Sequence, residues 1–458
     1  MTDLVLYDKS KVDNNNLLFP GNSIWKLLIP IVIEQFLKAL MGMVVTMMVS
    51  RVGSDAMSAV SLVDSVNILV IQVFTALAAG ATIVCSQYLG RKDEKTANEA
   101  ARQIMFTVFV ISTVLTIFCI GFKKPLLKLI FGKVEKSVMT ASLTYMWITA
   151  ASFPFIALFQ AGGACFRACG NSRFPMLVSV ISNVMNIVGN YILIFMFGMG
   201  VAGAAWATLA SRVFCMVVVT MGLAREKQSI VVKNYLRIRP DISLIKNILK
   251  IGIPSGIENG MFQFGKLAIQ SSVSTLGTVA IAAQAMTATL ENLTGIAAIG
   301  VGIGLMTIVG QCIGAGRVEE AKYYIVKLTI IGEILVAASS FIIFAGTKPI
   351  IYLAGMEKAA GDLCFTMMLA ITIVKPIVWW LAFVPSYGLR AAGDVKYFMI
   401  TSCIIMWFAR VALAVFLIHF MGFGPMAVWI GMFVDWTIRG LVCLHRYLSG
   451  KWLRYKVI

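Results

Sequence analysis

The chain has 458 residues, of which 59% are hydrophobic and 13% are charged. Soluble domains usually carry about a quarter charged residues, and the apolar residues here fall into runs of about 20, long enough to cross a bilayer as helices. This composition excludes an ordinary soluble enzyme or binding domain. A formal net charge of +18 would suggest nucleic acid as the partner of a soluble protein. For a membrane protein we expect membrane lipid as the partner and no nucleic acid. The informative observation is then which loops carry the positive charge.

Apolar runs separated by glycine, proline and charged clusters predict an all-α integral membrane protein with twelve transmembrane helices. In chain order they cover residues 24–50, 62–88, 100–121, 138–163, 175–197, 201–224, 250–275, 281–312, 324–345, 362–389, 397–420 and 426–447. The residues before the first run are polar and of mixed charge, so we expect no cleaved signal peptide.

The distribution of lysine and arginine predicts the orientation. If the N-terminus is cytoplasmic, 25 of the 39 basic residues fall in cytoplasmic segments or helix ends and eight fall outside. The loop at 122–136, with five lysines outside, is a local exception. The excess of positive charge on the inner side predicts a multi-pass protein of the cell membrane with both termini in the cytoplasm.

Residues that would indicate catalysis or a cofactor are sparse. The nine cysteines lie mostly inside apolar runs, and Cys165 and Cys169 lack a second pair that would complete a metal site,. Only His419 and His445 are histidines, and the chain has neither a phosphate-binding Gly-rich Lys-Ser/Thr loop nor an HExxH motif,. We therefore expect no enzyme activity, no metal and no cofactor, and an ion gradient as the energy source.

The sequence repeats itself. At an offset of 224 residues, Pro30 aligns with Pro254 and Glu34 with Glu258. At an offset of 223, the phrase FRACGN aligns with LRAAGD. Further matches are Gly53 with Gly277, Ala56 with Ala280, Ala59 with Ala283, Gln87 with Gln311, Gly90 with Gly314, Ala97 with Ala321, Gly198 with Gly422 and Gly200 with Gly424.

The repeat predicts two lobes of six helices each. The N-lobe covers residues 1–224 and the C-lobe 250–458, and a basic cytoplasmic linker at 225–249 joins them. Because six is even, the two lobes enter the membrane in the same sense, as parallel repeats. A cavity between two such lobes can open to alternate sides, which is the physical basis of alternating-access transport.

Ionisable residues inside the predicted helices are costly at membrane depth, so each needs a partner or a cavity. Asp64 has a structural explanation as a cap near a helix start. Asp435 and Arg439 lie one helical turn apart and can neutralise each other. The full set comprises the acids Glu34, Asp64, Glu258, Glu291, Glu333 and Asp435 and the bases Lys38, Arg212, Lys266, Lys375, Arg410 and Arg439.

Glu34 and Glu258 have the strongest functional signal. Each follows a proline by four residues in the first helix of its repeat, and a proline frees a backbone carbonyl and can open a polar notch. A carboxylate in an apolar cavity can exchange a proton or bind Na⁺. Lys38, one turn from Glu34, offers a static ion pair as the alternative.

The remaining candidates complete a predicted site. We expect Glu291 to join the cation-coupling carboxylates and expect helix kinks at Pro30, Pro254 and Pro376. Methionine and phenylalanine are abundant and would suit a promiscuous pocket, although in a membrane protein they more often face lipid or pack. The predicted substrate cavity is lined by Gln35, Asn259, Gln263, Gln284 and Asn292.

The ordered motifs resemble the bacterial multidrug and toxic compound extrusion (MATE) family over essentially the whole chain. They are Pro30-x-x-x-Glu34-Gln35, SRVGSDAMSAVSLVDS, QYLGRKDEKTA, FRACGNSRFPM, IPSGIENGMFQFGK and LRAAGDVKYFM. The resemblance implies a MATE-like fold and export of drugs or cationic metabolites in exchange for Na⁺ or H⁺. It also implies cation coupling at Glu258. Two positions depart from the family pattern, since Val45 and Lys375 stand where members often carry acids.

We therefore predict a secondary antiporter that exports amphipathic, often cationic, small organic compounds and functions as a monomer. A flippase for a lipid-linked precursor is the alternative, because a related fold performs that function. Such a flippase should have a strongly basic cavity, and the equal numbers of acids and bases inside the predicted helices weaken this alternative. A membrane-embedded enzyme is a third class, which the sparse histidines and the lack of a catalytic constellation disfavour.

Overall fold

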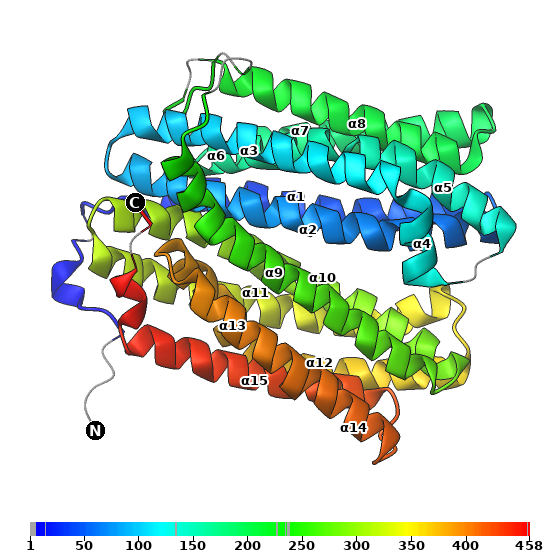
Figure 1. The fold of residues 1–458 in the computed structure, drawn as a ribbon. Coiled ribbons are helices and arrows are strands. Elements are labelled where there is room, and N and C mark those ends of the chain that lie inside the picture. Colours follow the sequence, from blue (N-terminus) through cyan, green and yellow to red (C-terminus); the bar gives the residue numbers. More distant parts are fainter. Residues whose placement is uncertain are drawn as a thin grey trace. The chain divides into compact units, whose positions relative to one another are not determined.

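The structure is a computed structural model that describes residues 6–13, 15–132, 135–225, 228–233, 235, 239–455 and 457–458. The described residues form helices and connecting turns, without strands (Figure 1). Long apolar segments become helices here because every backbone N–H and C=O must find its partner within its own segment in a bilayer.

The first half of the chain contains six membrane-crossing segments and one short extra helix, α4. The segments are α1 (Gly21–Ser50), α2 (Ser54–Gly90), α3 (Glu94–Gly121), α5 (Lys136–Ala151) with α6 (Phe153–Ala168), α7 (Arg173–Asn190) with the π-helix η2 (Tyr191–Met196), and α8 (Gly200–Leu223), while α4 spans Lys123–Phe131.

The second half repeats this order. Its segments are α9 (Ile242–Ser274), α10 (Thr278–Gly314), α11 (Val318–Leu353), α12 (Lys358–Ala391), then α13 (Val395–Ile405) with the π-helix η4 (Met406–Ala412) and α14 (Leu413–His419), and finally α15 (Met426–Leu448). Short 3-10 turns, η1 (Lys9–Lys11) and η5 (Lys451–Arg454), lie near the two ends of the chain.

The prediction of an all-α membrane fold with twelve spans is confirmed. Among the described residues, ten helices are long and apolar enough to cross a membrane, and α5 with α6 forms an eleventh span that is bent by 42°. The twelfth span is α9, a helix of 33 residues that carries Lys246, Lys250, Glu258 and Lys266. The sequence did not predict the bend, which falls at Ser152 directly before the first turn of α6, where Pro154 is tolerated,.

The backbone reproduces the repeat. Helices α2 and α10 both contain 37 residues. Each follows a glycine with positive φ, Gly53 at 142° and Gly277 at 92°. A side chain would be strained at these φ values, so glycine in both copies preserves one sharp connection between the first and second helices.

The helices pack as two units, which do not follow the two sequence halves. One, the C-terminal unit, comprises Met1–Gln35 with Ile257–Val457, and the other, the N-terminal unit, comprises Phe36–Gly256 with Ile458. Each unit thus contains part of the first helix of the opposite repeat, because the boundaries fall inside α1 and α9. Helix α9 begins at Ile242, within the segment expected to be linker. The lobe limits drawn from the repeat stay a prediction.

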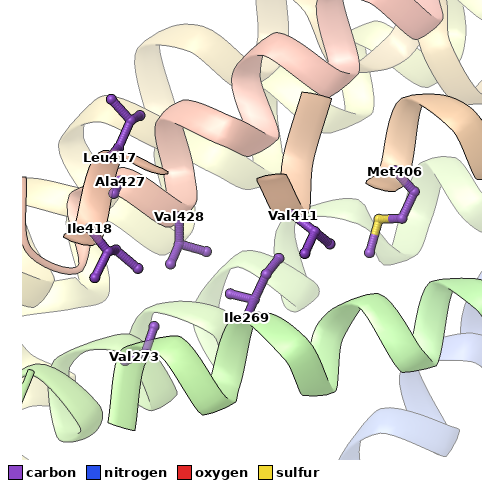
Figure 2. Packing of buried hydrophobic residues seen from close by; sticks show 8 residues of the cluster. All are labelled: Ile269, Val273, Met406, Val411, Leu417, Ile418, Ala427 and Val428. Atoms are coloured by element: carbon purple, nitrogen blue, oxygen red, sulfur yellow. The ribbon is translucent and has the colours of Figure 1, made fainter. Parts of the chain in front are cut away.

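The part of helix α9 that follows Gly256 packs in the C-terminal unit through an apolar cluster (Figure 2). Ile269 and Val273 of α9 are buried against residues of η4, α14 and α15. Gly265 leaves room for the Met406 side chain of η4. This packing fixes the face of α9 that carries Glu258 and Phe262 beside η4 and α15. The buried partners of Ile269 and Val273 in the cluster are Met406, Val411, Leu417, Ile418, Ala427 and Val428.

Candidate functional site

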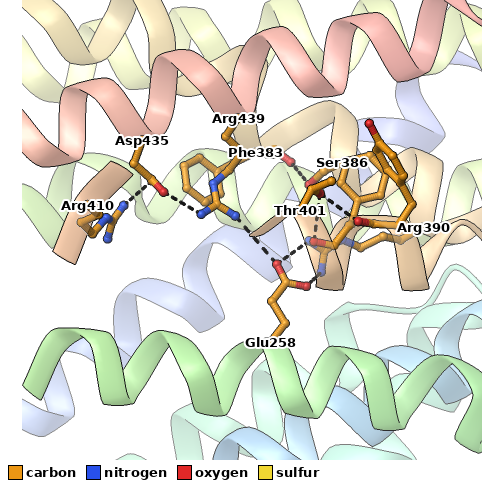
Figure 3. A network of polar contacts seen from close by, with 10 residues as sticks. Glu258, Phe383, Ser386, Arg390, Thr401, Arg410, Asp435 and Arg439 are labelled. Atoms are coloured by element: carbon orange, nitrogen blue, oxygen red, sulfur yellow. Dashed lines mark hydrogen bonds and ion pairs between the residues drawn. The ribbon is translucent and has the colours of Figure 1, made fainter. Parts of the chain in front are cut away.

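Glu258 lies at the centre of an ion-pair network in the C-terminal unit (Figure 3). Arg390, in the last turn of α12, donates from Nη2 to Oε1 of Glu258 at 2.9 Å. Its Nη1 lies 2.8 Å from the other carboxylate oxygen, so the contact is two-pronged,. Arg439 of α15 lies 4.0 Å from the same carboxylate. Arg390 lies at a helix end, and its pairing with Glu258 was not predicted from the sequence.

A second carboxylate, Asp435, extends the network along α15. It accepts hydrogen bonds from Arg410 at 2.7 Å and from Arg439 at 2.9 Å, and it is fully buried. The predicted Asp435–Arg439 pair is therefore confirmed. Arg410 belongs to η4, and a π-helical turn rotates the side chains that follow it relative to a regular α-helix,. The second arginine on Asp435 could not be predicted from spacing, because it comes from another helix.

Glu291 and Lys375 form a buried pair between α10 and α12. The Lys375 ammonium donates to the Glu291 carboxylate and, at 2.7 Å, to the hydroxyl of Thr294. Its Nζ lies 5.2 Å from the ring of Trp379 and 5.7 Å from that of Trp436. Only 1% of the Lys375 surface is exposed, and its ammonium donates to groups of Glu291 and Thr294. Glu291 is therefore already paired with a base.

Aromatic rings lie against the cations of the network. The Arg390 guanidinium lies 5.5 Å from the Phe398 ring and that of Arg439 lies 5.5 Å from Phe383. Phe262 is shared, since Arg410 lies 4.8 Å and Lys266 5.4 Å from its centroid. Such contacts stabilise a cation where water is scarce. They also bring Lys266 into the same group of residues.

The other predicted residues are placed as follows. Glu34 is buried in α1, with 1% of its surface exposed, and belongs to the C-terminal unit. Gln284 accepts a hydrogen bond from the Trp429 indole at 2.9 Å. Asn292 is exposed and donates to Ala288 of its own helix. Gln35, Asn259 and Gln263 are partly buried, and Pro30, Pro254 and Pro376 lie inside continuous helices.

The N-terminal unit contains a smaller polar group. Asp64 accepts from Asn67 at 3.1 Å and from the Tyr145 hydroxyl at 3.3 Å, and Arg212 donates to Ser152 at 2.6 Å. The interpretation of Asp64 as a cap is wrong, because α2 begins at Ser54, well before it. The N-terminal unit thus has its own half-buried carboxylate, on α2. Val45 stands in α1 at the position where the family often has an acid.

Twelve membrane-crossing helices in a doubled order, with ion pairs buried among the spans of one unit, define a polytopic membrane transporter. The profile of the MatE family matches residues 30–192 and again 254–416. The second match begins and ends 224 residues after the first, which is the offset of the internal repeat. The chain belongs to the MatE family, so the predicted family is confirmed.

Curated and solved relatives extend over almost the whole chain. It is 27% identical to a probable multidrug resistance protein NorM of Thermotoga maritima, which covers 94% of this chain and 93% of that protein. It is 26% identical to the uncharacterized transporter YisQ of Bacillus subtilis, over 94% and 95%. A MOP superfamily transporter from Pyrococcus furiosus has a similar fold, with a TM-score of 0.88 at 19% identity over 100% of this chain and 99% of that one.

Proposed function

We infer that this chain, a member of the MatE family, is a multidrug efflux transporter. We propose that it is a secondary active antiporter, which exports amphipathic organic compounds in exchange for Na⁺ or H⁺ by alternating access between its two repeats. The observation that carries this proposal is the charged network around Glu258 inside the membrane-spanning part of the chain. Ionisable groups at this depth usually mark the path of a substrate or ion.

The geometry around Glu258 disfavours a bound Na⁺ ion at this position. Arginine N–H groups approach both carboxylate oxygens of Glu258, at 2.9 and 2.8 Å. A Na⁺ ion there would face these guanidinium groups at short range and be repelled. Glu34 and Glu291 remain further candidates for coupling, with Glu291 already joined to Lys375.

The test is transport by the purified full-length protein in liposomes. An amphipathic dye should move against its concentration gradient when a pH gradient is imposed, and less or not at all with a Na⁺ gradient or a membrane potential alone. The variant Glu258→Gln should lose the dependence on the gradient while keeping its elution profile and unfolding temperature close to those of the wild type. Asp362→Asn, which removes the charge of an exposed carboxylate on α12, is the matched control.

Two results would count against the proposal. Absence of transport under all three driving forces, by protein that is folded and oriented, would contradict the antiporter. Full gradient dependence in Glu258→Gln would remove this carboxylate from coupling and transfer the proposal to Glu34 or Glu291. The flippase remains the second candidate, because bases outnumber acids in the network of the C-terminal unit.

A further inference from the structure

We propose that the cationic network of the C-terminal unit binds the anionic group of an amphipathic substrate, a carboxylate, sulfonate or phosphate. This inference rests on the proposed function, because it names the class of substrate that the transporter would carry. It departs from the expectation of an often cationic substrate, which the family resemblance implied, and it bears on the flippase alternative, which the equal numbers of acids and bases in the sequence weakened. The structure shows that these charges are not evenly distributed.

The network carries more positive than negative charge. The residues joined by ion pairs or through the shared Phe262 ring are four cations and two anions. Adding the Glu291–Lys375 pair leaves the excess unchanged, at two positive charges. The cations are Lys266, Arg390, Arg410 and Arg439, and the anions are Glu258 and Asp435. Such an excess among membrane-spanning helices is costly, and a bound anion would neutralise it.

Hydrogen bonding gives a second, independent argument. Each guanidinium has five N–H donors, and the two carboxylates of the network cannot accept from all fifteen donors of three arginines. The Nε atoms of Arg390, Arg410 and Arg439 are buried without an acceptor among the described residues. Buried donors without partners are uncommon and costly. An oxyanion, with several lone pairs directed outward, supplies acceptors of the required kind.

The residues of the network differ in how much of their surface is exposed. Arg410 and Arg439 are 2% and 6% exposed. Glu258 and Arg390 are partly accessible, with 11% and 19% of their side chains exposed, and Lys266 is exposed. A ligand reaching the network would therefore meet Lys266 and Arg390 first. Phe262 lies beside Lys266 and Phe383 beside Arg439, and both rings are partly exposed, so they offer apolar contacts for the remainder of an amphipathic molecule,.

The energetics of export favour an anion as well. With the inside of the cell negative, moving one negative charge outward releases about 2.3 kcal/mol per 100 mV. A cation must be moved against the same potential. A site with excess positive charge compensates the substrate's charge during the crossing, so the potential can assist export. A basic site of this kind would also suit an anionic lipid headgroup, which is the chemistry of the alternative flippase.

The experiment compares two dyes built on the same ring system. Fluorescein is an anion near neutral pH and rhodamine 6G is a cation, so their difference in affinity reports mainly the sign of the site. Binding to the full-length protein in lipid nanodiscs is measured by fluorescence anisotropy. We expect fluorescein to bind more tightly than rhodamine 6G. Tighter binding of rhodamine 6G would overturn the proposal.

Variants locate the site. Arg390→Gln should weaken fluorescein binding by about tenfold or more, because it removes a charge-assisted contact. Glu258→Gln removes a negative charge and should leave fluorescein binding unchanged or tighter. Lys128→Gln, on the exposed helix α4, changes the net charge equally but lies outside the network and should have no effect. Equal loss in Arg390→Gln and Lys128→Gln would contradict a specific site.

Competition on the wild type keeps the test decisive if Arg390→Gln does not fold. Octyl sulfonate should displace fluorescein and octyltrimethylammonium should not; the reverse order refutes the proposal. Displacement by nanodiscs of phosphatidylglycerol but not phosphatidylcholine would support the anion site with lipid as its occupant. Displacement by inorganic phosphate alone would refute an amphipathic ligand. Gradient-driven transport of rhodamine 6G without fluorescein binding would leave the antiporter intact and reject only the anion site.

Discussion

Lys375 illustrates how a single residue can reverse an expectation. The family resemblance led us to expect an acid in this helix, and the structure gives Lys375 a partner, Glu291, on α10. Its burial is nearly complete, at 1% exposed. A buried ammonium is tolerated only when its donors are satisfied and its charge is matched. The base at this position therefore has a structural role in joining α10 to α12, whatever its part in transport.

Separating this pair should be costly. Lys375→Met leaves the Glu291 carboxylate buried without its base, and we expect a loss of about 3–5 kcal/mol of stability. The double variant Lys375→Met with Glu291→Leu removes both charges and should recover much of the loss. The thermal unfolding temperature in detergent, with Asn292→Ala as the control, measures both effects. An unchanged unfolding temperature in Lys375→Met would show that the pair contributes little.

Ion pairs could be predicted only where the two partners lie close together in the sequence. The spacing of Asp435 and Arg439 is sufficient, because one helical turn brings them together. The partner of Glu258 is Arg390, and they are 132 positions apart, so nothing local connects them. One signal did exist, since Arg390 aligns with Arg167 across the repeat. Arg410 could not be assigned to Asp435, because its direction depends on a π-helical turn.

At the scale of helices, glycine determines where the first helix of one repeat lies against the other repeat. A Cβ on Gly80 of α2 would lie 2.9 Å from the carbonyl oxygen of Ile248 and 3.4 Å from the nitrogen of Gly252, both on α9. The equivalent position on α10, Gly304, faces Leu28 of α1. The two contacts are related by the repeat, and both depend on the absence of a side chain, as in other close helix pairs in membranes.

Gly80→Ala should therefore destabilise the N-terminal unit. The added methyl meets the backbone of α9, which must shift, and overpacking of this kind costs about 1–3 kcal/mol. Gly42→Ala is the matched control, because nothing lies within 4 Å of its Cβ position and alanine is the better helix former. The unfolding temperature should fall for the first variant and hold or rise for the second. A fall of equal size in both would exclude the close contact as the cause.

Element positions were largely predictable and their interruptions were not. Hydropathy located all twelve spans, because a long apolar run has few alternatives to a helix in a bilayer. The break at Ser152 and the π-helices η2 and η4 were missed. These depend on how side chains of neighbouring helices pack, which a hydropathy pattern does not contain. The helices also extend beyond the predicted runs, as in α11, since polar turns continue past the apolar core.

For the molecule as a whole, a segment near the start of the chain contacts the end of α15 within the C-terminal unit. The Tyr447 hydroxyl at the end of α15 donates to the carbonyl of Leu6 at 2.6 Å. An even number of spans requires both termini on one side, and the basic residues favour the cytoplasm. We predict that epitope tags at both termini are protected from protease in intact cells, and that a tag inserted at Gly355, between α11 and α12, is cleaved. A cleaved terminal tag in sealed cells would contradict this topology.

The division of α1 between the two packing units has a consequence for biosynthesis. Residues up to Gln35 belong to the C-terminal unit, where Phe19 exchanges hydrogen bonds with Tyr324 and Leu28 faces Gly304. Ribosomes deliver the chain from its N-terminus, and domains ordinarily fold as they emerge. The start of α1 must instead wait in the bilayer until α10 and α11 have been inserted. The earliest helix made is thus among the last to find its neighbours, which leaves it dependent on the insertion machinery for the longest time.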